Sequence, residues 1–392
     1  MAKRKPAVRK TAEAPAQLTQ LPEIKIPELP GVENRPYQNR TVTKTLQHFL
    51  QGTPSVLIEA PTGSGKSIMA FQCIKFWTDM GLTVTWSTMR RNLLRQSGGQ
   101  LEDFGLKVNV VSMFAEDVPH TDILIFDEGH HLGSVTGMHL LSQVKPKFLL
   151  IMSATPLRTD KIRLPVAATV RDASIYALMR EGYLSNYDHW IAEKADPVTY
   201  ARMYMADREK WGKTVAFFHT EIACRKFAVE LEANGIECPV VMGNENFKAN
   251  IKRFEEHCDV ATSVNVMLEG YDYPPLRTVF LRDASRTPSI QMAGRALRLW
   301  DGKEKANIVQ SDGTKWNISR SSRPLQSHVW KNDAWARVGD DTKVTEAVQT
   351  TITRLSAADA PTMPKFILER QKKKRGIRAD ALGNDMRDAR RV

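Results

Sequence analysis

A glycine-rich segment between an apolar run and a helical stretch constrains the fold of this chain most strongly. Residues 60–67 read Ala-Pro-Thr-Gly-Ser-Gly-Lys-Ser and stand between the apolar run Val56–Ile58 and the amphipathic stretch Ile68–Met80. Glycines in such a turn let backbone N–H groups point at phosphate oxygens, and the following helix adds the positive end of its dipole. Lys66 would reach the β- and γ-phosphates of a nucleotide, and the Ser67 hydroxyl would bind Mg²⁺. The segment predicts a phosphate-binding loop.

Short apolar runs alternate with longer amphipathic stretches along most of the chain. This alternation predicts an α/β protein with two tandem units, each a mostly parallel sheet with helices on both faces. The predicted strands are Val56–Ile58, Val84–Trp86, Val108–Val111, Ile123–Phe126, Phe148–Met152, Val215–Phe218, Pro239–Met242 and Val279–Leu281. The predicted helices are Ile68–Met80, Met89–Phe104, Ile222–Ala233, Phe247–His257 and Ser289–Leu299.

Shifts in composition suggest where these units begin and end. We expect, in chain order, a disordered basic arm (1–33), a first α/β unit (34–165), a connecting segment (166–212), a second α/β unit (213–311), a C-terminal extension of unknown role (312–364) and a basic tail (365–392). Three tryptophans indicate packed structure in the extension, and Thr345–Leu355 could form a helix.

The net charge of +12 belongs almost wholly to the two ends. Residues 1–10 carry five basic and no acidic side chains, and residues 365–392 carry ten basic and four acidic ones, so residues 11–364 hold only +1. Basic ends of this kind favour nucleic acid as a partner. The apolar runs are far shorter than the roughly 20 residues of a membrane helix, so we expect no membrane association. Four cysteines without a C-x-x-C pair suit a reducing compartment.

An acidic pair follows the apolar run Ile123–Phe126, in the sequence Asp-Glu-Gly-His at 127–130. A carboxylate at the end of a parallel strand beside a phosphate loop can hold Mg²⁺ through water, which suggests this role for Asp127. Glu128 would then orient and deprotonate the attacking water. His130, His131 and His139 have no acid or thiol that completes a metal-ligand set, so we expect no metal there.

A second basic motif closes the second α/β unit. Arg295 and Arg298 are three residues apart, so both would project from one face of a helix. Two guanidinium groups presented together suit a triphosphate, one stabilising the charge of the transition state and the other orienting the substrate. A surface arginine pair on a solvated helix is the alternative.

Together these segments resemble the superfamily 2 helicases and translocases, in the branch that includes restriction-enzyme motor subunits and phage recombination helicases. The matching segments are RPYQ at 35–38, APTGSGKS at 60–67, MRRNLLRQ at 89–96, DEGH at 127–130, SAT at 153–155, EGYDYP at 269–274 and QMAGRALR at 291–298. The resemblance covers about residues 34–310. Asp-Glu-Gly-His in place of Asp-Glu-Ala-Asp points away from the typical DEAD-box RNA helicases, and Val264 stands where the family often has threonine.

The resemblance implies two RecA-like domains with ATP in the cleft between them and a nucleic-acid strand across both. It assigns nucleotide contacts to Gln38, which would read the base, and to Pro61, Thr62, Gly63, Ser64, Gly65, Lys66, Ser67, Gly270, Asp272 and Gln291. It assigns magnesium to Ser67 and Asp127, and catalysis to Lys66, Asp127, Glu128, Arg295 and Arg298. It assigns coupling between hydrolysis and movement to Ser153 and Thr155, and nucleic-acid contacts to Arg91, Gln96 and Ser263.

From these features we expect an ATP-dependent DNA helicase or translocase that acts in replication, recombination or repair, with ATP and Mg²⁺ as cofactors. An RNA helicase or remodeller is the alternative within the class. A nucleic-acid-binding scaffold without ATPase activity and a P-loop kinase or metabolic ATPase are alternatives from other classes. Candidate partners besides DNA are replication or recombination proteins, and the oligomeric state is unknown. We expect the cytoplasm of a bacterial or phage-infected cell, or the nucleus in a eukaryote, where Lys372–Arg375 could direct import.

Overall fold

The computed structural model describes residues 23–89, 91–154, 164–243, 246–268, 271–331 and 334–338, with only the backbone for Arg91 and Asn92. The chain divides into a compact unit at 1–336 and a second unit at 337–392. The predictions for Thr155, Gly270, the helix Thr345–Leu355 and the basic tail therefore lie outside the described residues, as does the basic arm up to residue 22. Among the described helices, none is both long and apolar enough to cross a membrane.

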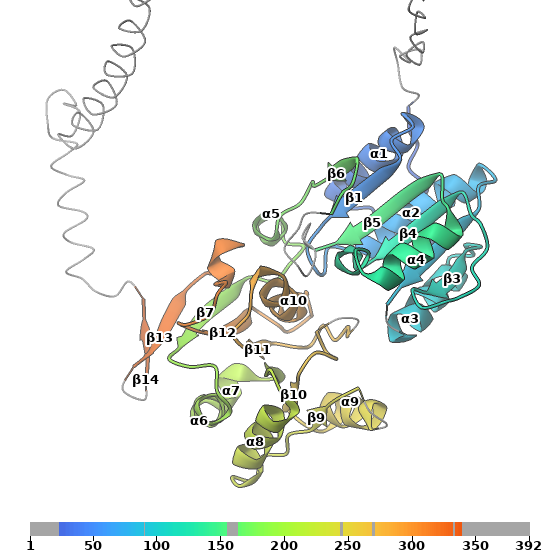
Figure 1. The fold of residues 1–392 in the computed structure, drawn as a ribbon. Coiled ribbons are helices and arrows are strands. Elements are labelled where there is room, and N and C mark those ends of the chain that lie inside the picture. The colour runs from blue at the N-terminus through green and yellow to red at the C-terminus, as the bar shows by residue number, and fades with distance from the viewer. Residues whose placement is uncertain are drawn as a thin grey trace, which may run out of the picture. The chain divides into compact units, whose positions relative to one another are not determined.

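The first sheet has six strands in the order β3-β2-β4-β5-β1-β6, and every pairing in it is parallel (Figure 1). Its strands are β1 (Ser55–Glu59), β2 (Val84–Thr88), β3 (Asn109–Ser112), β4 (Ile123–Asp127), β5 (Phe148–Ser153) and β6 (Ala168–Val170). Its helices are α1 (Pro36–Leu50), α2 (Lys66–Asp79), α3 (Arg91–Asp103), the short 3-10 helix η1 (Gly129–His131) and α4 (Val135–Val144).

Alternating apolar residues on β1 explain why helices cover both faces of this sheet. Val56 and Ile58 pack in one buried cluster with residues of α1, α2 and α3. Leu57 points to the opposite face and packs in a second cluster with Leu140 and Val144 of α4. Side chains of a strand alternate between its two faces, so three consecutive apolar residues require cover on both.

The second sheet has eight strands in the order β14-β13-β7-β12-β11-β8-β10-β9. Its strands are β7 (Tyr187–Ala192), β8 (Thr214–Phe217), β9 (Val240–Val241), β10 (Val260–Ser263), β11 (Thr278–Phe280), β12 (Ala306–Ser311), β13 (Ser327–Lys331) and β14 (Ala334–Arg337). The accompanying helices are α5 (Ile175–Arg180), α6 (Pro197–Ala206), α7 (Arg208–Trp211), α8 (Glu221–Glu232), α9 (Phe247–Glu256), α10 (Arg286–Ala296) and the 3-10 helix η2 (Ile318–Arg320). The predicted α/β class with mostly parallel sheets is confirmed.

Details of the second α/β unit differ from the sequence prediction. The sequence patterns did not predict β10, because two of its four residues, Thr262 and Ser263, are polar although both are fully buried. The helix predicted at Ser289–Leu299 begins and ends earlier, as α10. Arg298 therefore lies beyond the helix end, and its position relative to Arg295 depends on the following turn.

Three segments expected to lie outside the two α/β units contribute to the folded core. Residues 166–212 supply β6 to the edge of the first sheet and β7 to the interior of the second, where β7 lies between β12 and β13. In the segment 23–33, Leu29 is buried against the first core. In the segment 312–338, β13 pairs with β7 and Trp330 is buried.

Candidate nucleotide-binding site

The phosphate loop leaves β1 and turns directly into α2. Gly63 and Gly65 have φ angles of +82° and +76°, a left-handed conformation that glycine adopts without strain. The Lys66 ammonium donates to the carbonyl oxygens of Ala60 and Pro61, each at 3.2 Å. Burial lowers the pKa of Lys66, and the carboxylates of Glu128 and Asp127 oppose that shift. The loop thus folds around its own lysine, beside two acids.

Helix α1 holds the same loop from the other side. The Tyr37 hydroxyl and the Gln38 amide both donate to the Ser64 carbonyl oxygen, at 2.7 and 3.0 Å. The Gln38 amide also lies so close to Gly65 that a side chain at that position would overlap it. In this structure Gln38 therefore contacts the loop, and the prediction that it reads a base remains a proposal.

The acidic pair lies where β4 ends. Asp127 is buried, and its Oδ1 accepts the backbone N–H of Glu128 at 2.9 Å. Glu128 has a φ angle of +54°, an unusual conformation for a residue other than glycine. Strain of this kind costs about 1–3 kcal/mol and occurs often at functional sites. The Glu128 Oε2 lies 3.5 Å from Nδ1 of His130.

The glycine that follows the acidic pair has a steric explanation. A Cβ atom at Gly129 would overlap the Cγ2 atom of Ile151 on β5. The segment Asp-Glu-Gly-His therefore departs from Asp-Glu-Ala-Asp at a position where this particular neighbouring strand leaves no room for alanine.

We expect Gly129→Ala to lower the free energy of unfolding by about 1–3 kcal/mol, because the added methyl group overpacks a rigid strand. Chemical denaturation would measure the loss. Ile151→Ala removes the overlapping atom, so the double variant should be clearly more stable than the sum of the two single effects predicts. Additive losses would show that the overlap with Ile151 is not the cause.

The two predicted arginines of the second α/β unit, Arg295 and Arg298, have different environments. Arg295 is 5% exposed, and its guanidinium donates to the carbonyl oxygens of Leu268 (2.6 and 3.0 Å) and Tyr271 (2.7 Å). Arg298 forms an ion pair with Asp272. Burial lowers the pKa of the Arg298 guanidinium, and Asp272 opposes that shift. Arg295 therefore holds the preceding loop in place, while Arg298 carries the more accessible charge.

Lys303 supports this arrangement and was not predicted. Its ammonium donates to the carbonyl oxygens of Pro274 (2.9 Å), Leu276 (3.1 Å) and Ala296 (3.1 Å). Burial lowers the pKa of Lys303 to about 8, and the charge of Arg298 adds to that shift. One side chain thereby joins the end of α10 to the loop that carries Asp272.

Residues that follow strands of both sheets line one cavity of about 390 Å³, within the range of ligand-binding pockets. The residues of its wall that were predicted for nucleotide binding or catalysis are Thr62, Gly63, Gly65, Lys66, Ser67, Asp127, Glu128, Asp272, Arg295 and Arg298. Close packing joins the two sides: a Cβ atom at Gly294 of α10 would lie 2.7 Å from Cβ of Thr62. The Ser67 hydroxyl, the Asp127 carboxylate and the Lys66 ammonium thus border one space, a donor set that fits Mg²⁺ and phosphate.

Two unpredicted residues line one end of this cavity. The Arg35 guanidinium lies over the ring of Tyr183, 5.1 Å from the ring centroid. Arg35 stood within the RPYQ segment but was not itself assigned a role. Tyr183 falls in the segment expected to connect the units, where no sequence signal pointed to a site.

The remaining predicted residues have other environments. Pro61 lines a separate cavity, and Gln96 lines the nucleotide-sized cavity although a nucleic-acid contact was predicted for it. Of these remaining residues, Ser64, Ser153, Ser263 and Gln291 are buried. A fully buried Ser263 cannot touch a nucleic acid in this conformation.

The sequence of this chain is similar to those of several known proteins. Residues 31–117 match the family described as "Type III restriction enzyme, res subunit". "Putative helicase 22" of Sulfolobus islandicus filamentous virus (isolate Iceland/Hveragerdi) is 24% identical over 363 residues, covering 72% of this chain and 64% of the virus protein. The predicted resemblance to the superfamily 2 helicases is confirmed by the family match and by the viral relatives described as putative helicases.

Two solved structures share the fold of this chain. The ATP-dependent Type ISP restriction-modification enzyme LlaBIII bound to DNA has a TM-score of 0.56 at 14% identity, covering 74% of this chain and 28% of that one. S. cerevisiae Dbp5 bound to RNA and ADP BeF3 has a TM-score of 0.53 at 15% identity, covering 81% and 97%. The predicted RecA-like fold is confirmed. The chain thus spans under a third of the restriction enzyme and less than two thirds of the viral relative.

Proposed function

We propose that this chain is an ATP-dependent helicase or translocase that hydrolyses ATP in the 390 Å³ cavity and uses the reaction to move along DNA. One observation carries the proposal. The phosphate loop and acidic pair of the first sheet share a cavity wall with Asp272 and Arg298 of the second. A nucleotide bound there would touch both sheets, so its hydrolysis would change the contacts between them.

In the proposed reaction, the triphosphate lies along the loop 60–67, with its β- and γ-phosphates at Lys66. The Glu128 carboxylate accepts a proton from a water molecule as the water oxygen attacks the γ-phosphorus. The bond from that phosphorus to the β–γ bridging oxygen breaks, which leaves ADP and inorganic phosphate. Arg298 exchanges its Asp272 partner for the negative charge that develops on the γ-phosphoryl oxygens.

The residues that would hold Mg²⁺ are Ser67 and Asp127, through the hydroxyl and the carboxylate. When bound, the ion would neutralise charge on the β- and γ-phosphate oxygens. The backbone N–H of Glu128 donates to Asp127 Oδ1, so this contact orients the carboxylate that the ion would need.

A cluster at the carboxyl ends of β8, β10 and β11 supports a nucleic-acid contact that the sequence did not predict. Arg282 lies 3.1 Å from the ring nitrogen Nδ1 of His219 and donates to the Asn265 side-chain oxygen at 3.1 Å. His219 and Asn265 are exposed. A cation flanked by exposed polar groups at one sheet edge is suited to a phosphate of the backbone.

We expect Arg282→Ala to weaken nucleic-acid binding and to reduce the salt dependence of the binding constant by about one phosphate contact, a slope change of roughly 0.7–0.9. Fluorescence anisotropy with a labelled strand at several salt concentrations would measure both. Arg225→Ala is the matched control, because Arg225 is an exposed arginine that pairs with Glu221 on its own helix. An unchanged slope in Arg282→Ala would remove Arg282 from the interface.

The DNA preference rests on the relatives described as restriction enzymes, one of them bound to DNA. The structural neighbour bound to RNA supports RNA as the second candidate. ATP hydrolysis by the full chain should be measured side by side with single-stranded DNA, double-stranded DNA, forked DNA and RNA. Stimulation by DNA above RNA supports the proposal, and stimulation by RNA alone favours the second candidate. No hydrolysis with any of them would contradict the proposed activity.

A further inference from the structure

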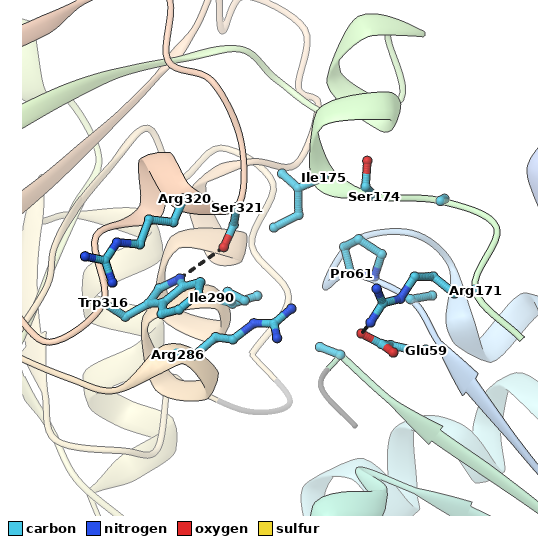
Figure 2. A pocket seen from close by; sticks show the side chains of 13 residues that line it. Glu59, Pro61, Arg171, Ser174, Ile175, Arg286, Ile290, Trp316, Arg320 and Ser321 are labelled. Atoms are coloured by element: carbon cyan, nitrogen blue, oxygen red, sulfur yellow. Dashed lines mark hydrogen bonds and ion pairs between the residues drawn. The ribbon is translucent and has the colours of Figure 1, made fainter. Parts of the chain in front are cut away.

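A second cavity, of about 290 Å³, borders the start of the phosphate loop (Figure 2). Glu59, Ala60 and Pro61 at the end of β1 form part of its wall. Residues of α10 and the segment after β12 form another part, including Arg286 and Trp316. The cavity thus has its own residues from both sheets and shares none of the acidic or basic groups of the nucleotide-sized cavity.

Glu59 enters this cavity with half of its carboxylate unpaired. Its side chain is only 6% exposed, and one oxygen pairs with Arg171. Its Oε2 atom is buried and has no hydrogen-bond partner among the described residues. A buried carboxylate oxygen without a donor is costly, so the site favours the arrival of a further donor.

Arg286 is a donor on the opposite wall. Its guanidinium lies over the ring of Trp316, 5.4 Å from the centroid, and its buried Nε atom has no hydrogen-bond partner among the described residues. Figure 2 shows the Arg286 side chain extended across the cavity toward Glu59 and Arg171. Within the described part of the chain, no ion pair joins Arg286 to Glu59, so the cavity separates two incompletely satisfied groups of opposite charge.

We propose that Arg286 and Glu59 form an ion pair when ATP draws the two sheets together, and that this pair positions the site for hydrolysis. Glu59 directly precedes the phosphate loop, and Arg286 begins the helix that carries Arg295. The ion pair would therefore fix the position of the phosphate loop relative to the first turn of α10, while Arg295 lies near the other end of this helix. This inference rests on the proposed ATP hydrolysis.

The charges of the cavity favour this pairing over a bound anion. Arg171, Arg286 and Arg320 would attract a phosphate, but the Glu59 carboxylate in the same wall would repel it. A guanidinium satisfies the open carboxylate oxygen with a charge-assisted hydrogen bond, which is among the stronger polar contacts in proteins. Closure also removes water from the pair, which strengthens it further.

Steady-state ATP hydrolysis at saturating nucleic acid tests the pair. We expect Glu59→Gln and Arg286→Gln each to lower kcat about tenfold, while the KM for ATP changes much less. Because either change breaks the same contact, the double variant should be no slower than the slower single variant. Arg286→Lys, which keeps the charge, should restore part of the lost rate. Arg320→Gln is the matched control, since Arg320 contacts the same indole from 5.5 Å but is not expected to couple to Glu59.

A double variant that is about a hundredfold slower would show independent effects and would overturn the pair. The ion pair would also be overturned if Arg286→Gln and Arg320→Gln weakened nucleic-acid affinity equally and left kcat unchanged. That result would make the cavity part of the nucleic-acid-binding surface. If the wild-type chain hydrolyses no ATP, the proposed function fails before the pair is tested. Failure of the pair alone leaves wild-type hydrolysis intact.

Discussion

Glu128→Gln should reduce ATP hydrolysis by about 10²–10⁴-fold while ATP binding persists. The amide has nearly the shape of the carboxylate, but it cannot accept the proton of the attacking water. The substitution leaves the backbone N–H that Glu128 donates to Asp127, so the proposed magnesium ligand keeps its orientation. The left-handed backbone at this position likewise depends on the surrounding structure and not on the charge of the side chain.

Phosphate release measures the rate of Glu128→Gln, and titration with a fluorescent ATP analogue measures binding. Glu102→Gln is the matched control, because Glu102 is an exposed glutamate on α3 outside the cavity. Hydrolysis near the wild-type rate in Glu128→Gln would assign the base to another group. Loss of nucleotide binding in the same variant would instead indicate that the carboxylate acts before the chemical step.

Arg298→Ala should lower kcat by at least about 10³-fold, as expected for an arginine that stabilises transition-state charge in phosphoryl transfer. Arg298 lies beyond the end of α10, and its guanidinium pairs with Asp272 and makes one long hydrogen bond, of 3.4 Å, to the Tyr271 carbonyl oxygen, so its removal should leave the fold intact. The KM for ATP should change far less than kcat, because the contact with developing charge is made mainly in the transition state.

Arg295→Ala provides the contrast. Arg295 donates three hydrogen bonds to backbone carbonyl oxygens in a buried position, and its removal would leave those acceptors unpaired. We expect a loss on the order of 3 kcal/mol in the free energy of unfolding, together with lower activity. Thermal unfolding and phosphate release distinguish the two variants. Equal stability losses in both, or near-normal turnover in Arg298→Ala, would contradict this division of roles.

The sequence supported the nucleotide site because its chemistry lies in short local patterns. A strand, a glycine turn and a helix in direct succession produce the phosphate loop, and an acidic pair after an apolar run lies at the carboxyl edge of a parallel sheet. Lys66, Ser67, Asp127 and Glu128, which the sequence assigned to one site, line the same cavity. The α/β class followed from the same alternation of strands and helices.

Contacts between distant segments could not be predicted in this way. Tyr183 joins the cavity from a segment that looked like a connection, and Lys303 bonds carbonyl groups that no sequence pattern places together. β10 was not predicted because half of its residues are polar. Its threonine and serine are buried between neighbouring strands, and this burial cannot be seen in the local sequence. Nucleic-acid contacts were predicted for Ser263 and Gln96 from their positions in motifs. In the structure Ser263 is buried, and Gln96 lines the nucleotide-sized cavity.

The sequence by itself therefore determined the loop, the acids, the arginines and the order in which two parallel sheets supply them. Only the tertiary structure decided that Arg295 holds a backbone loop while Arg298 carries the accessible charge, that Gly129 is required by Ile151, and that Glu59 faces Arg286 across a cavity. Local patterns specify which groups a chain carries and on which element. Packing determines which of those groups are buried, which are paired and which lack a hydrogen-bond partner, because these properties depend on neighbours that are remote in the sequence.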